Sequence, residues 1–384
     1  MRMIPLVLCA LGCALGIGPA ALALAQVDIP SQINAVFAGI SENGPGCSVG
    51  VAQNGEWLHK AGYGLANMEL NVPLDGTHVH RMASVSKQFT AMAVLLLADE
   101  GKIDLDADIR DYLPVLKPYG AKVSINAMLG HTAGMGDYDL IAGSYEGPKA
   151  DNAIELTSAA GGDFRLGNED YLTIDEFYAL VAQVPLAQAP DEGFLYSNLA
   201  YFLLAMLVEE VSGESLRAYA DRRIFVPLGM HNTFFSDDPV EIVAHRADGY
   251  KKNEAGVFIN DMTNLFWVGD GGLHTNLDDM LIWDRQFYEP RLGKDPRQLM
   301  AVMNTPNSPH SARGERYANG QFVGAVNGES VFRHSGGWLG TATYYARLPG
   351  RHMSLMMMCN DAGIDDALAE QSLQVMLGSG KRAR

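Results

Sequence analysis

The clearest alternation of hydrophobic and polar positions lies near the start of the chain, in CSVGVAQNGEWLHKAGYG (residues 47–64). The two alternating runs meet at Asn54 and Gly55, which is typical of a β-hairpin because both turn positions favour a positive φ. Short apolar or β-branched runs return late, in residues 320–334, 341–349 and 354–360, separated by Gly, Asn and Pro. Both ends of the chain therefore predict strands.

Between these ends the pattern is helical. SKQFTAMAVLLLADEG (residues 86–101) is apolar almost all round, as in a buried helix, and Gly101 is placed to end it. NLAYFLLAMLVEEVSGES (residues 198–215) has the same character and ends at Gly213, and residues 277–288 form a shorter amphipathic helix. We therefore predict an α/β fold, in which both termini share one antiparallel sheet flanked by helices, with an all-helical subdomain inserted at about residues 111–264.

The first 25 residues are predicted to be a secretory signal peptide. Arg2 precedes an apolar stretch, and Ala23-Leu24-Ala25 provides a small-residue cleavage site before Gln26. An uncleaved amino-terminal anchor is the alternative. No later segment reaches the roughly 18 apolar residues that span a bilayer. We expect one periplasmic or secreted domain over residues 26–378 and a frayed tail over 379–384.

Composition narrows the classes of partner. The chain has 384 residues, of which 48% are hydrophobic, so a large core is available. Its formal net charge of -17 opposes binding to nucleic acid and to anionic lipid surfaces. We expect a small-molecule or peptide substrate and no metal or cofactor, while the oligomeric state is left open.

Two cysteines remain after the predicted signal is removed, because Cys9 and Cys13 lie within it. Cys47 begins an early strand and Cys359 ends the last one, so they would face each other if those strands pair antiparallel. In an oxidising compartment they could form a disulfide, and they could equally be two buried small hydrophobic residues.

Three serines are candidate nucleophiles. Ser48 fits Gly-x-Ser-x-Gly, but that motif needs a helix after the serine, and here a hairpin follows. Ser84 and Lys87 are three positions apart and share one helix face, whereas Ser86 is adjacent to Lys87 and points elsewhere. Ser84 also lies where the helix is predicted to begin, where backbone N–H groups favour developing negative charge. A capping serine beside a solvated lysine is the alternative interpretation.

Two further stretches follow in order: Tyr196-Ser197-Asn198 before a buried helix, and His334-Ser335-Gly336-Gly337 before a strand. Ser-x-x-Lys, Tyr-x-Asn and a cation-Ser-Gly triplet in this order resemble the serine β-lactamase and penicillin-binding-protein superfamily. Within it, the chain looks most like the class C β-lactamases, the D-aminopeptidases and related esterases. LGHTAGM, PLGMHNT and GDGGLHTNLDDMLIWDRQF support this resemblance, which covers about residues 33–377.

The resemblance implies an ester of Ser84 as intermediate, with Lys87 and Tyr196 sharing the proton transfers and with a Tyr196 pKa lowered by the site. It also implies substrate contacts and an oxyanion hole of backbone N–H groups, for which a residue without a side chain suits position 337. The implied set is catalytic Ser84, Lys87 and Tyr196; substrate-binding Asn198, His334 and Ser335; and oxyanion donors Ser84 and Gly337.

His334 departs from the family pattern, because penicillin-recognising members usually carry lysine there. A histidine with a reference pKa near 6.5 is mostly neutral at pH 7, so binding of a substrate carboxylate is weakened. The predicted function is a hydrolase for an ester or a D-amino-acid amide. One alternative is a class C-like β-lactamase or D,D-carboxypeptidase. A second alternative, which is not an enzyme, is a domain that senses β-lactams or peptidoglycan.

Other residues have weaker signals. Tyr317-Ala318-Asn319 is a second Tyr-x-Asn match that leads into a strand. His78 and His80 lack the rest of a metallo-hydrolase pattern, so packing is favoured over metal binding. His131 is predicted to be structural, and Trp338 to line the pocket mouth or to pack. Residues 143–170 are predicted to form a long surface loop.

Overall fold

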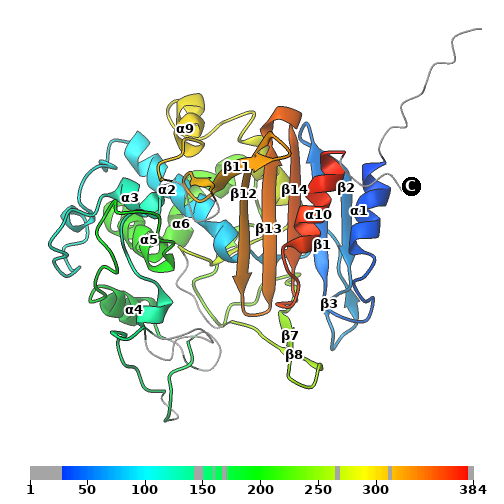
Figure 1. The fold of residues 1–384 in the computed structure, drawn as a ribbon, viewed down its shortest axis with the longest axis horizontal. Coiled ribbons are helices and arrows are strands. Elements are labelled where there is room, and N and C mark those ends of the chain that lie inside the picture. Colours follow the sequence, from blue (N-terminus) through cyan, green and yellow to red (C-terminus); the bar gives the residue numbers. More distant parts are fainter. Residues whose placement is uncertain are drawn as a thin grey trace, which may run out of the picture.

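A seven-stranded sheet runs through the centre of the molecule in the order β10-β11-β12-β13-β14-β1-β2, and each neighbouring pair of strands is antiparallel (Figure 1). The predicted signal and tail, and part of the predicted surface loop, lie outside the residues that are described. This computed structural model describes residues 28–141, 150–158, 161–166, 170, 172–263, 269–309 and 314–378.

The hairpin predicted at Asn54-Gly55 joins the first two strands, and both turn residues have positive φ (53° and 76°). The first strand pairs with the last, so the two ends of the chain share one sheet, as the pattern predicted. Cys47 and Cys359 are partners in that register and are joined by a disulfide. The strands are β1 Cys47–Gln53, β2 Glu56–Tyr63, β10 Arg316–Tyr317, β11 Phe322–Val326, β12 Glu329–Trp338, β13 Thr341–Leu348 and β14 Met353–Cys359.

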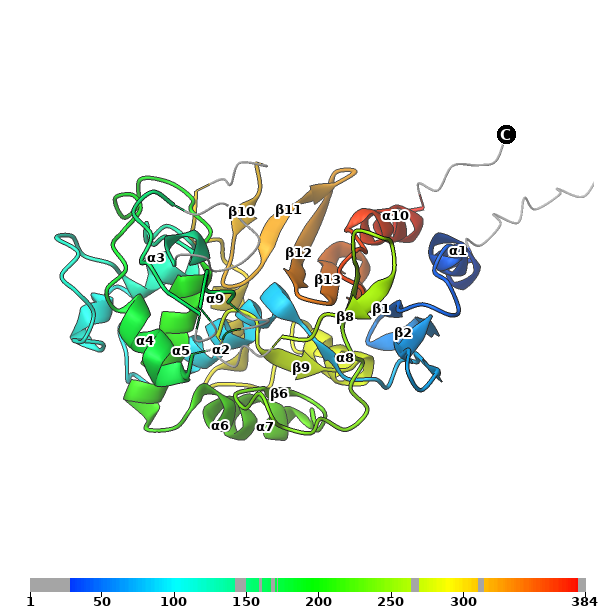
Figure 2. The same ribbon diagram turned by 90° about the horizontal axis from the view of Figure 1, so that it is seen from below.

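Strand β14 is buried on both faces, which explains why its sequence shows no alternation. Met356 and Met358 belong to the core shared with α2 and α8, whereas Leu355 and Met357 pack with α1 and α10. Burying each such side chain contributes about 1.5–3 kcal/mol. Figure 2 shows α1 and α10 on one side of the sheet. These helices are α1 Ile29–Phe37, α2 Lys87–Asp99, α8 Leu277–Arg285 and α10 Ala367–Met376.

Helix α2 is the centre of the helical region and packs against α5 (Figure 1). Every α2 residue from Lys87 to Leu97 is buried, so its almost uniformly apolar sequence matches its surroundings. Gly101 and Gly213 follow α2 and α5 with φ of 76° and 74°, a conformation that favours glycine at a helix end. The remaining helices are α3 Ile125–Leu129, α4 Ile174–Val181, α5 Asn198–Ser212, α6 Leu216–Ala220, α7 Val226–Leu228 and α9 Pro296–Met303.

The prediction of an all-helical insertion at 111–264 was wrong in one respect, because this interval contains three short strands. They are β6 Phe234–Phe235, β7 Tyr250–Lys252 and β8 Phe258–Asn260. Strands of two or three residues carry no readable alternation, and β6 exists only because it pairs with β9 (Leu273–Thr275). β9 also pairs with β5 (His80–Arg81), which leads the chain into the segment containing Ser84.

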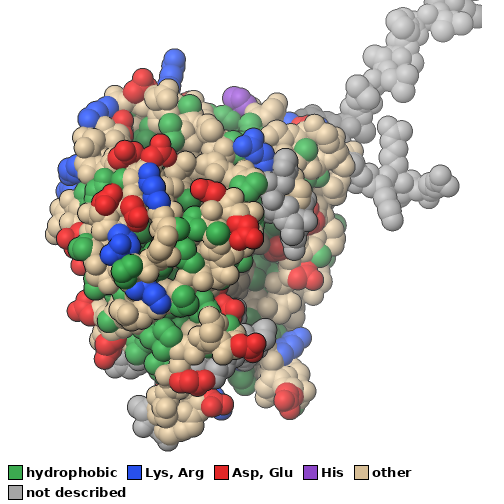
Figure 3. Space-filling view, turned by 60° about the vertical axis from the view of Figure 1, so that its left-hand side comes forward, with side chains coloured by type: hydrophobic (Ala, Val, Ile, Leu, Met, Phe, Trp, Pro, Cys, Tyr) green, Lys and Arg blue, Asp and Glu red, His purple; other side chains and the backbone are tan. Residues whose placement is uncertain are grey.

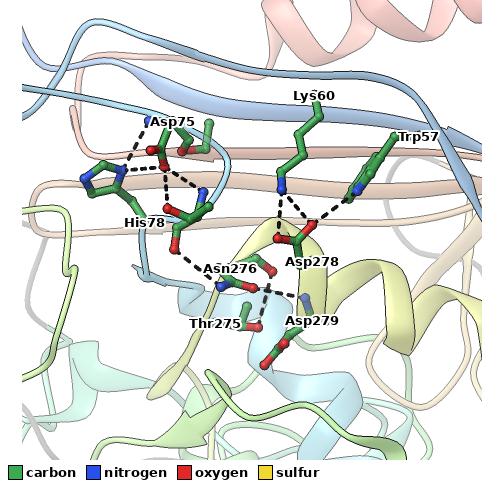
Figure 4. Close-up of polar contacts among 10 residues, drawn as sticks. Trp57, Lys60, Asp75, His78, Thr275, Asn276, Asp278 and Asp279 are labelled. Atoms are coloured by element: carbon green, nitrogen blue, oxygen red, sulfur yellow. Dashed lines mark hydrogen bonds and ion pairs between the residues drawn. The ribbon is translucent and has the colours of Figure 1, made fainter.

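Polar contacts fix the start of α8 against the sheet (Figure 4). Lys60 of β2 pairs with Asp278 in the first turn of α8 at 2.7 Å. The Asn276 side chain accepts a hydrogen bond from the Asp279 backbone N–H and donates one to the Thr77 carbonyl (3.4 Å). The cap of α8 is thereby tied to the segment that precedes β5.

Charged groups are distributed over the outside of the molecule. Figure 3 shows acidic and basic side chains intermixed with hydrophobic ones on one face. Of the helices in the described part of the chain, none has the length and apolar character needed to cross a membrane. The ionisable groups that matter for chemistry are those buried beside α2.

Candidate active site

Ser84 and Lys87 lie side by side, as their spacing predicted. Ser84 lies in a short 3₁₀ turn (Ala83–Ser86) that leads directly into α2 at Lys87. The fully buried Lys87 amine donates a hydrogen bond to Ser84 Oγ at 3.1 Å. Ala83 adopts φ 43°, a strained conformation for a non-glycine residue that is typical of functional sites. Ser86 instead accepts the Leu273 backbone N–H and so holds the turn against β9.

The Lys87 amine has three hydrogen bonds, one for each proton of its charged form. Besides Ser84, it donates to Asn198 Oδ1 and to the Asp270 backbone carbonyl, both at 2.7 Å. Burial lowers the pKa of Lys87 to about 8, although the charges of Asp270 and Asp137 oppose this shift. A useful fraction of Lys87 is therefore free amine near neutral pH, with its lone pair available to the serine proton.

Tyr196 lies beside this pair, with its ring centre 4.9 Å from the Lys87 amine. The phenol oxygen is buried and has no hydrogen bond of standard geometry to any of the described residues. Burial raises the pKa of Tyr196 well above 10, opposed by the nearby Ser84 hydroxyl. The pKa of Tyr196 is therefore shifted opposite to the expected direction, because desolvation and the carboxylates of Asp137 and Asp270 outweigh the contact with Ser84.

Asn198 begins α5, where Ser197 caps the helix by accepting the Ala200 backbone N–H. The Asn198 amide donates to Asp137 Oδ2 at 3.0 Å, which turns the amide oxygen toward Lys87. Burial raises the pKa of Asp137 to about 6 despite stabilising contacts from the Tyr138 backbone N–H and Lys87. A continuous polar chain thus runs from Asp137 through Asn198 to Lys87 and Ser84.

A pocket of about 340 Å³ opens onto Ser84. Six residues that line it were not among the predicted site residues, and of these only Trp338 was considered for the pocket. They are Arg81, Ala83, Tyr138, Asp270, Gly271 and Trp338. The two acidic residues near Lys87, Asp137 and Asp270, could have been noticed in the sequence, because each follows a glycine, in GDY and GDGG. An acidic residue in a turn is usually solvated, so only the fold reveals that these two are buried.

The predicted oxyanion donors also meet at this pocket, which Ser84 and Gly337 both line. Within the protein itself, the position that requires the absence of a side chain is Gly336, while the predicted role of Gly337 toward a substrate oxygen stays a prediction. A Cβ at Gly337 would meet nothing within 4 Å, whereas one at Gly336 would lie 2.5 Å from the Met82 carbonyl oxygen and 3.0 Å from the Ser84 nitrogen. Gly336 is the position at which β12 approaches the serine turn most closely.

His334 and Ser335 are placed differently from the other predicted residues. His334 is 3% exposed, and its Nδ1 donates to the Ser335 carbonyl while Nε2 accepts from the Tyr317 hydroxyl at 3.0 Å. Burial and the charge of Lys87 lower the pKa of His334 to about 3, so the ring is neutral. Ser335 lines a neighbouring open pocket with Gly337 and Trp338, and not the one that contains Ser84.

His131 packs its ring against Tyr196, with ring centres 4.3 Å apart, and accepts the Ser197 backbone N–H. It therefore supports the Tyr-x-Asn segment. Tyr317, from the second Tyr-x-Asn match, also packs against His131, with ring centres 4.6 Å apart, and donates its hydroxyl to His334. Both aromatic residues help to position Tyr196.

The other candidate residues are held by local contacts. Ser48 is buried inside β1 and donates to the Asp75 carbonyl, and its hydroxyl also contacts His80. His78 contacts the Asp75 carboxylate at 3.0 Å (Figure 4). Within the described ranges, no group of three or more His, Cys, Asp or Glu side chains is arranged to hold a metal ion.

The geometry agrees with the family assignment from sequence comparison. The model of the β-lactamase family matches residues 33–376. This chain belongs to the β-lactamase family. It is 27% identical over 335 residues to a D-aminopeptidase of Gluconobacter oxydans, and 33% identical over 247 residues to the esterase EstB of Burkholderia gladioli. These alignments cover 87% and 62% of this chain, and it spans about three fifths of each relative's length (59%).

Solved structures share the β-lactamase and transpeptidase-like fold. An octameric penicillin-binding protein homologue from Pyrococcus abyssi superposes with a TM-score of 0.76 at 24% identity, over 91% of this chain and 77% of that one. A D-amino acid amidase from Ochrobactrum anthropi superposes with a TM-score of 0.70 at 20% identity, over 92% and 99%. These structures confirm the predicted fold class, and the family model confirms the predicted superfamily.

Proposed function

We propose that this protein is a serine hydrolase that forms an acyl-enzyme on Ser84 and cleaves an ester or a D-amino-acid amide. The observation that carries the proposal is the hydrogen bond from a buried amine of lowered pKa, Lys87, to the Ser84 hydroxyl. An amine that is partly free near neutral pH is suited to accept the serine proton. A cap or surface lysine would keep its ordinary pKa.

In the first half of the reaction, Ser84 Oγ bonds to the substrate carbonyl carbon while Lys87 takes its proton. The carbonyl oxygen becomes an oxyanion that accepts hydrogen bonds from the backbone N–H groups of Ser84 and Gly337. Tyr196 then protonates the leaving amine or alcohol as its bond to carbon breaks, and Lys87 returns a proton to Tyr196. A neutral phenol is the right form for this step, since the pKa of Tyr196 is raised by burial.

In the second half, water attacks the Ser84 ester and passes its proton through Lys87 to the departing serine oxygen. The products are a carboxylic acid and the regenerated hydroxyl. Asn198 keeps Lys87 oriented and offers its amide to the substrate, and Asp137 holds that amide in place. Neutral His334 acts behind the site, by positioning Tyr317 and Tyr196.

The β-lactamase and D,D-carboxypeptidase alternative is less favoured by the charges. His334 is neutral and buried, so the position that usually holds a lysine offers no cation to a substrate carboxylate. A sensing domain would require the serine ester to persist. Lys87, Tyr196 and Asn198 together make up the groups needed to activate water, which favours turnover.

The test compares wild type with Ser84→Ala and Ser48→Ala on p-nitrophenyl acetate and on D-alanine p-nitroanilide. Loss of the nucleophile is expected to lower kcat by about 10⁴-fold or more, whereas Ser48→Ala retains activity. Intact mass after brief incubation with a penicillin reports any acylation of Ser84. Full activity in Ser84→Ala would disprove the proposal, and a lasting penicillin adduct without turnover of either substrate would favour the sensing domain.

We also propose export, with residues 1–25 as the signal peptide. A disulfide between Cys47 and Cys359 suits an oxidising compartment and supports this proposal. Amino-terminal sequencing of the exported protein is expected to begin near Gln26. Retention of residues 1–25 would indicate an anchor instead.

A further inference from the structure

One oxygen of Asp270 is left without a partner beside the nucleophile. The side chain is 7% exposed and lines the same pocket as Ser84. Oδ2 accepts a hydrogen bond from the Tyr138 hydroxyl at 2.5 Å, but Oδ1 is buried and accepts none from any residue in the described part of the chain. A buried acceptor without a donor is unfavourable, so a donor is expected to arrive from outside the protein.

Neither of the nearby cations, Lys87 and Arg81, donates a hydrogen bond to Asp270 Oδ1. The Lys87 amine contacts the backbone carbonyl of Asp270 at 2.7 Å and uses its other protons on Ser84 and Asn198. Arg81 lies close enough for its charge to act on Asp270, yet no hydrogen bond reaches Oδ1. The carboxylate is therefore held in place by Tyr138 with one oxygen still available.

The charges of the pocket favour a cation. When Lys87 is the free base that accepts the serine proton, Arg81 on the pocket wall contributes one positive charge. Asp270 on the same wall and Asp137, which binds the Asn198 amide next to the pocket, contribute two negative charges when both are ionised. The net charge of the reactive state is then -1. A substrate with one positive charge neutralises the pocket, whereas an anionic substrate would add repulsion at short range.

From this geometry we infer that Asp270 selects substrates whose acyl part carries a primary ammonium group next to the scissile carbonyl. The ammonium donates to the free Oδ1 while the carbonyl carbon faces Ser84. The pocket of about 340 Å³ is small, and Ser84 and Asp270 both line it, so the cation lies close to the reacting carbon. The inference rests on the proposed function, and it disfavours N-acylated substrates, which include the β-lactams.

The test uses three p-nitroanilides that differ only at the amine: D-alanine, N-acetyl-D-alanine and propionic acid. Wild type is expected to show a kcat/KM at least tenfold higher for the free amine than for either uncharged analogue. Asp270→Asn removes the charge at constant shape and is expected to reduce this ratio at least fivefold. Asp284→Asn is the matched control, because Asp284 is also buried and also accepts a tyrosine hydroxyl, that of Tyr345.

The outcomes separate this inference from the proposed function. Equal or faster cleavage of the uncharged analogues by wild type would overturn the inference, provided that Ser84→Ala still abolishes hydrolysis of p-nitrophenyl acetate. Hydrolysis of that ester by Ser84→Ala would overturn the proposed function and the inference with it. If Asp270→Asn does not fold, the wild-type ratio alone decides.

Discussion

Two buried carboxylates in this molecule each accept a tyrosine hydroxyl, but the groups around them differ. Asp284 of α8 accepts hydrogen bonds from Tyr345 at 2.7 Å and from Ser354, both at Oδ1. Asp270 beside Ser84 accepts the Tyr138 hydroxyl at Oδ2, and its Oδ1 has no hydrogen-bond partner among the described residues. Tyr196, two residues before Asn198, also has a buried hydroxyl with no hydrogen bond of standard geometry to the residues that the structure describes.

The difference separates polar groups that hold the fold from polar groups that await a substrate. Buried polar atoms in a fold are usually satisfied, because an unsatisfied one costs about 1–3 kcal/mol. Buried atoms without a partner among the described residues also occur away from the site, at Tyr288 and Arg347 near Asp284. Those of Asp270 and Tyr196 differ because they lie beside Ser84, where a substrate or transition state can supply the missing partner. Variants in the two regions should therefore have opposite effects on activity and on stability.

The largest expected effect is on activity, at Lys87. Lys87→Met replaces the buried amine with an unbranched apolar side chain of similar length, and so removes the base. We expect kcat/KM for p-nitrophenyl acetate to fall by about 10²–10⁴-fold. Circular dichroism and the thermal midpoint provide the folding control. A loss smaller than tenfold in a folded variant would remove Lys87 from the mechanism.

The second effect is on stability, at Asp284. Asp284→Ala leaves the buried hydroxyls of Tyr345 and Ser354 without their shared acceptor. At about 1–3 kcal/mol for each of the two hydroxyls, the free energy of unfolding is expected to fall by roughly 2–6 kcal/mol. Urea denaturation measures this change, and kcat/KM under native conditions should stay within twofold. A large loss of activity in the folded variant would contradict the separation of the two regions.

A pair of glycine variants tests how closely β12 must approach the serine turn. Gly336→Ala places a Cβ 2.5 Å from the Met82 carbonyl oxygen and from Thr343 Oγ1, so the turn that carries Ser84 has to move. A displacement of about 1 Å is expected to lower kcat/KM by about 10²-fold. Gly337→Ala has open space and should lose much less. Equal losses in both variants would show that the contact does not position Ser84.

The smallest effect is the pH dependence set by Lys87. Only its free amine accepts a proton, and burial lowers its pKa to about 8. For an uncharged ester, kcat/KM is expected to rise tenfold per pH unit below 8 and to level above it. Of the groups facing the amine, His334 and His131 have lowered pKa values because of burial and stay neutral there. Burial raises the pKa of Tyr196 above this pH range, so its hydroxyl stays protonated. Burial raises the pKa of Asp137 to about 6, so kcat/KM is expected to fall more steeply with pH below about 6.

Asp270 is a further ionisable neighbour of Lys87, and its charge affects the pH at which Lys87 loses its proton. Burial raises its pKa, opposed by Lys87 and by the Tyr138 hydroxyl. A rate that is flat between pH 6 and 8 would exclude Lys87 as the titrating base.

The sequence by itself determined the features that depend on short spacings. The positive φ preference at Asn54-Gly55 gave the hairpin, and the three-residue step from Ser84 to Lys87 placed both on one side of a helical turn. Uniformly apolar runs ended by Gly101 and Gly213 gave the two central helices. The order of the three motifs indicated the superfamily, and thereby the pairing of residues that are far apart in the chain.

Only the tertiary structure decided the properties that depend on burial and on partners from distant segments. Asp137 and Asp270 lie in turns that resemble ordinary surface turns, and the fold encloses them against Lys87. The strand pairing of β6 with β9, the close approach of Gly336 to the serine turn and the raised pKa of Tyr196 have the same origin. Desolvation and steric contact arise between segments that are far apart in the chain, so no local pattern encodes them.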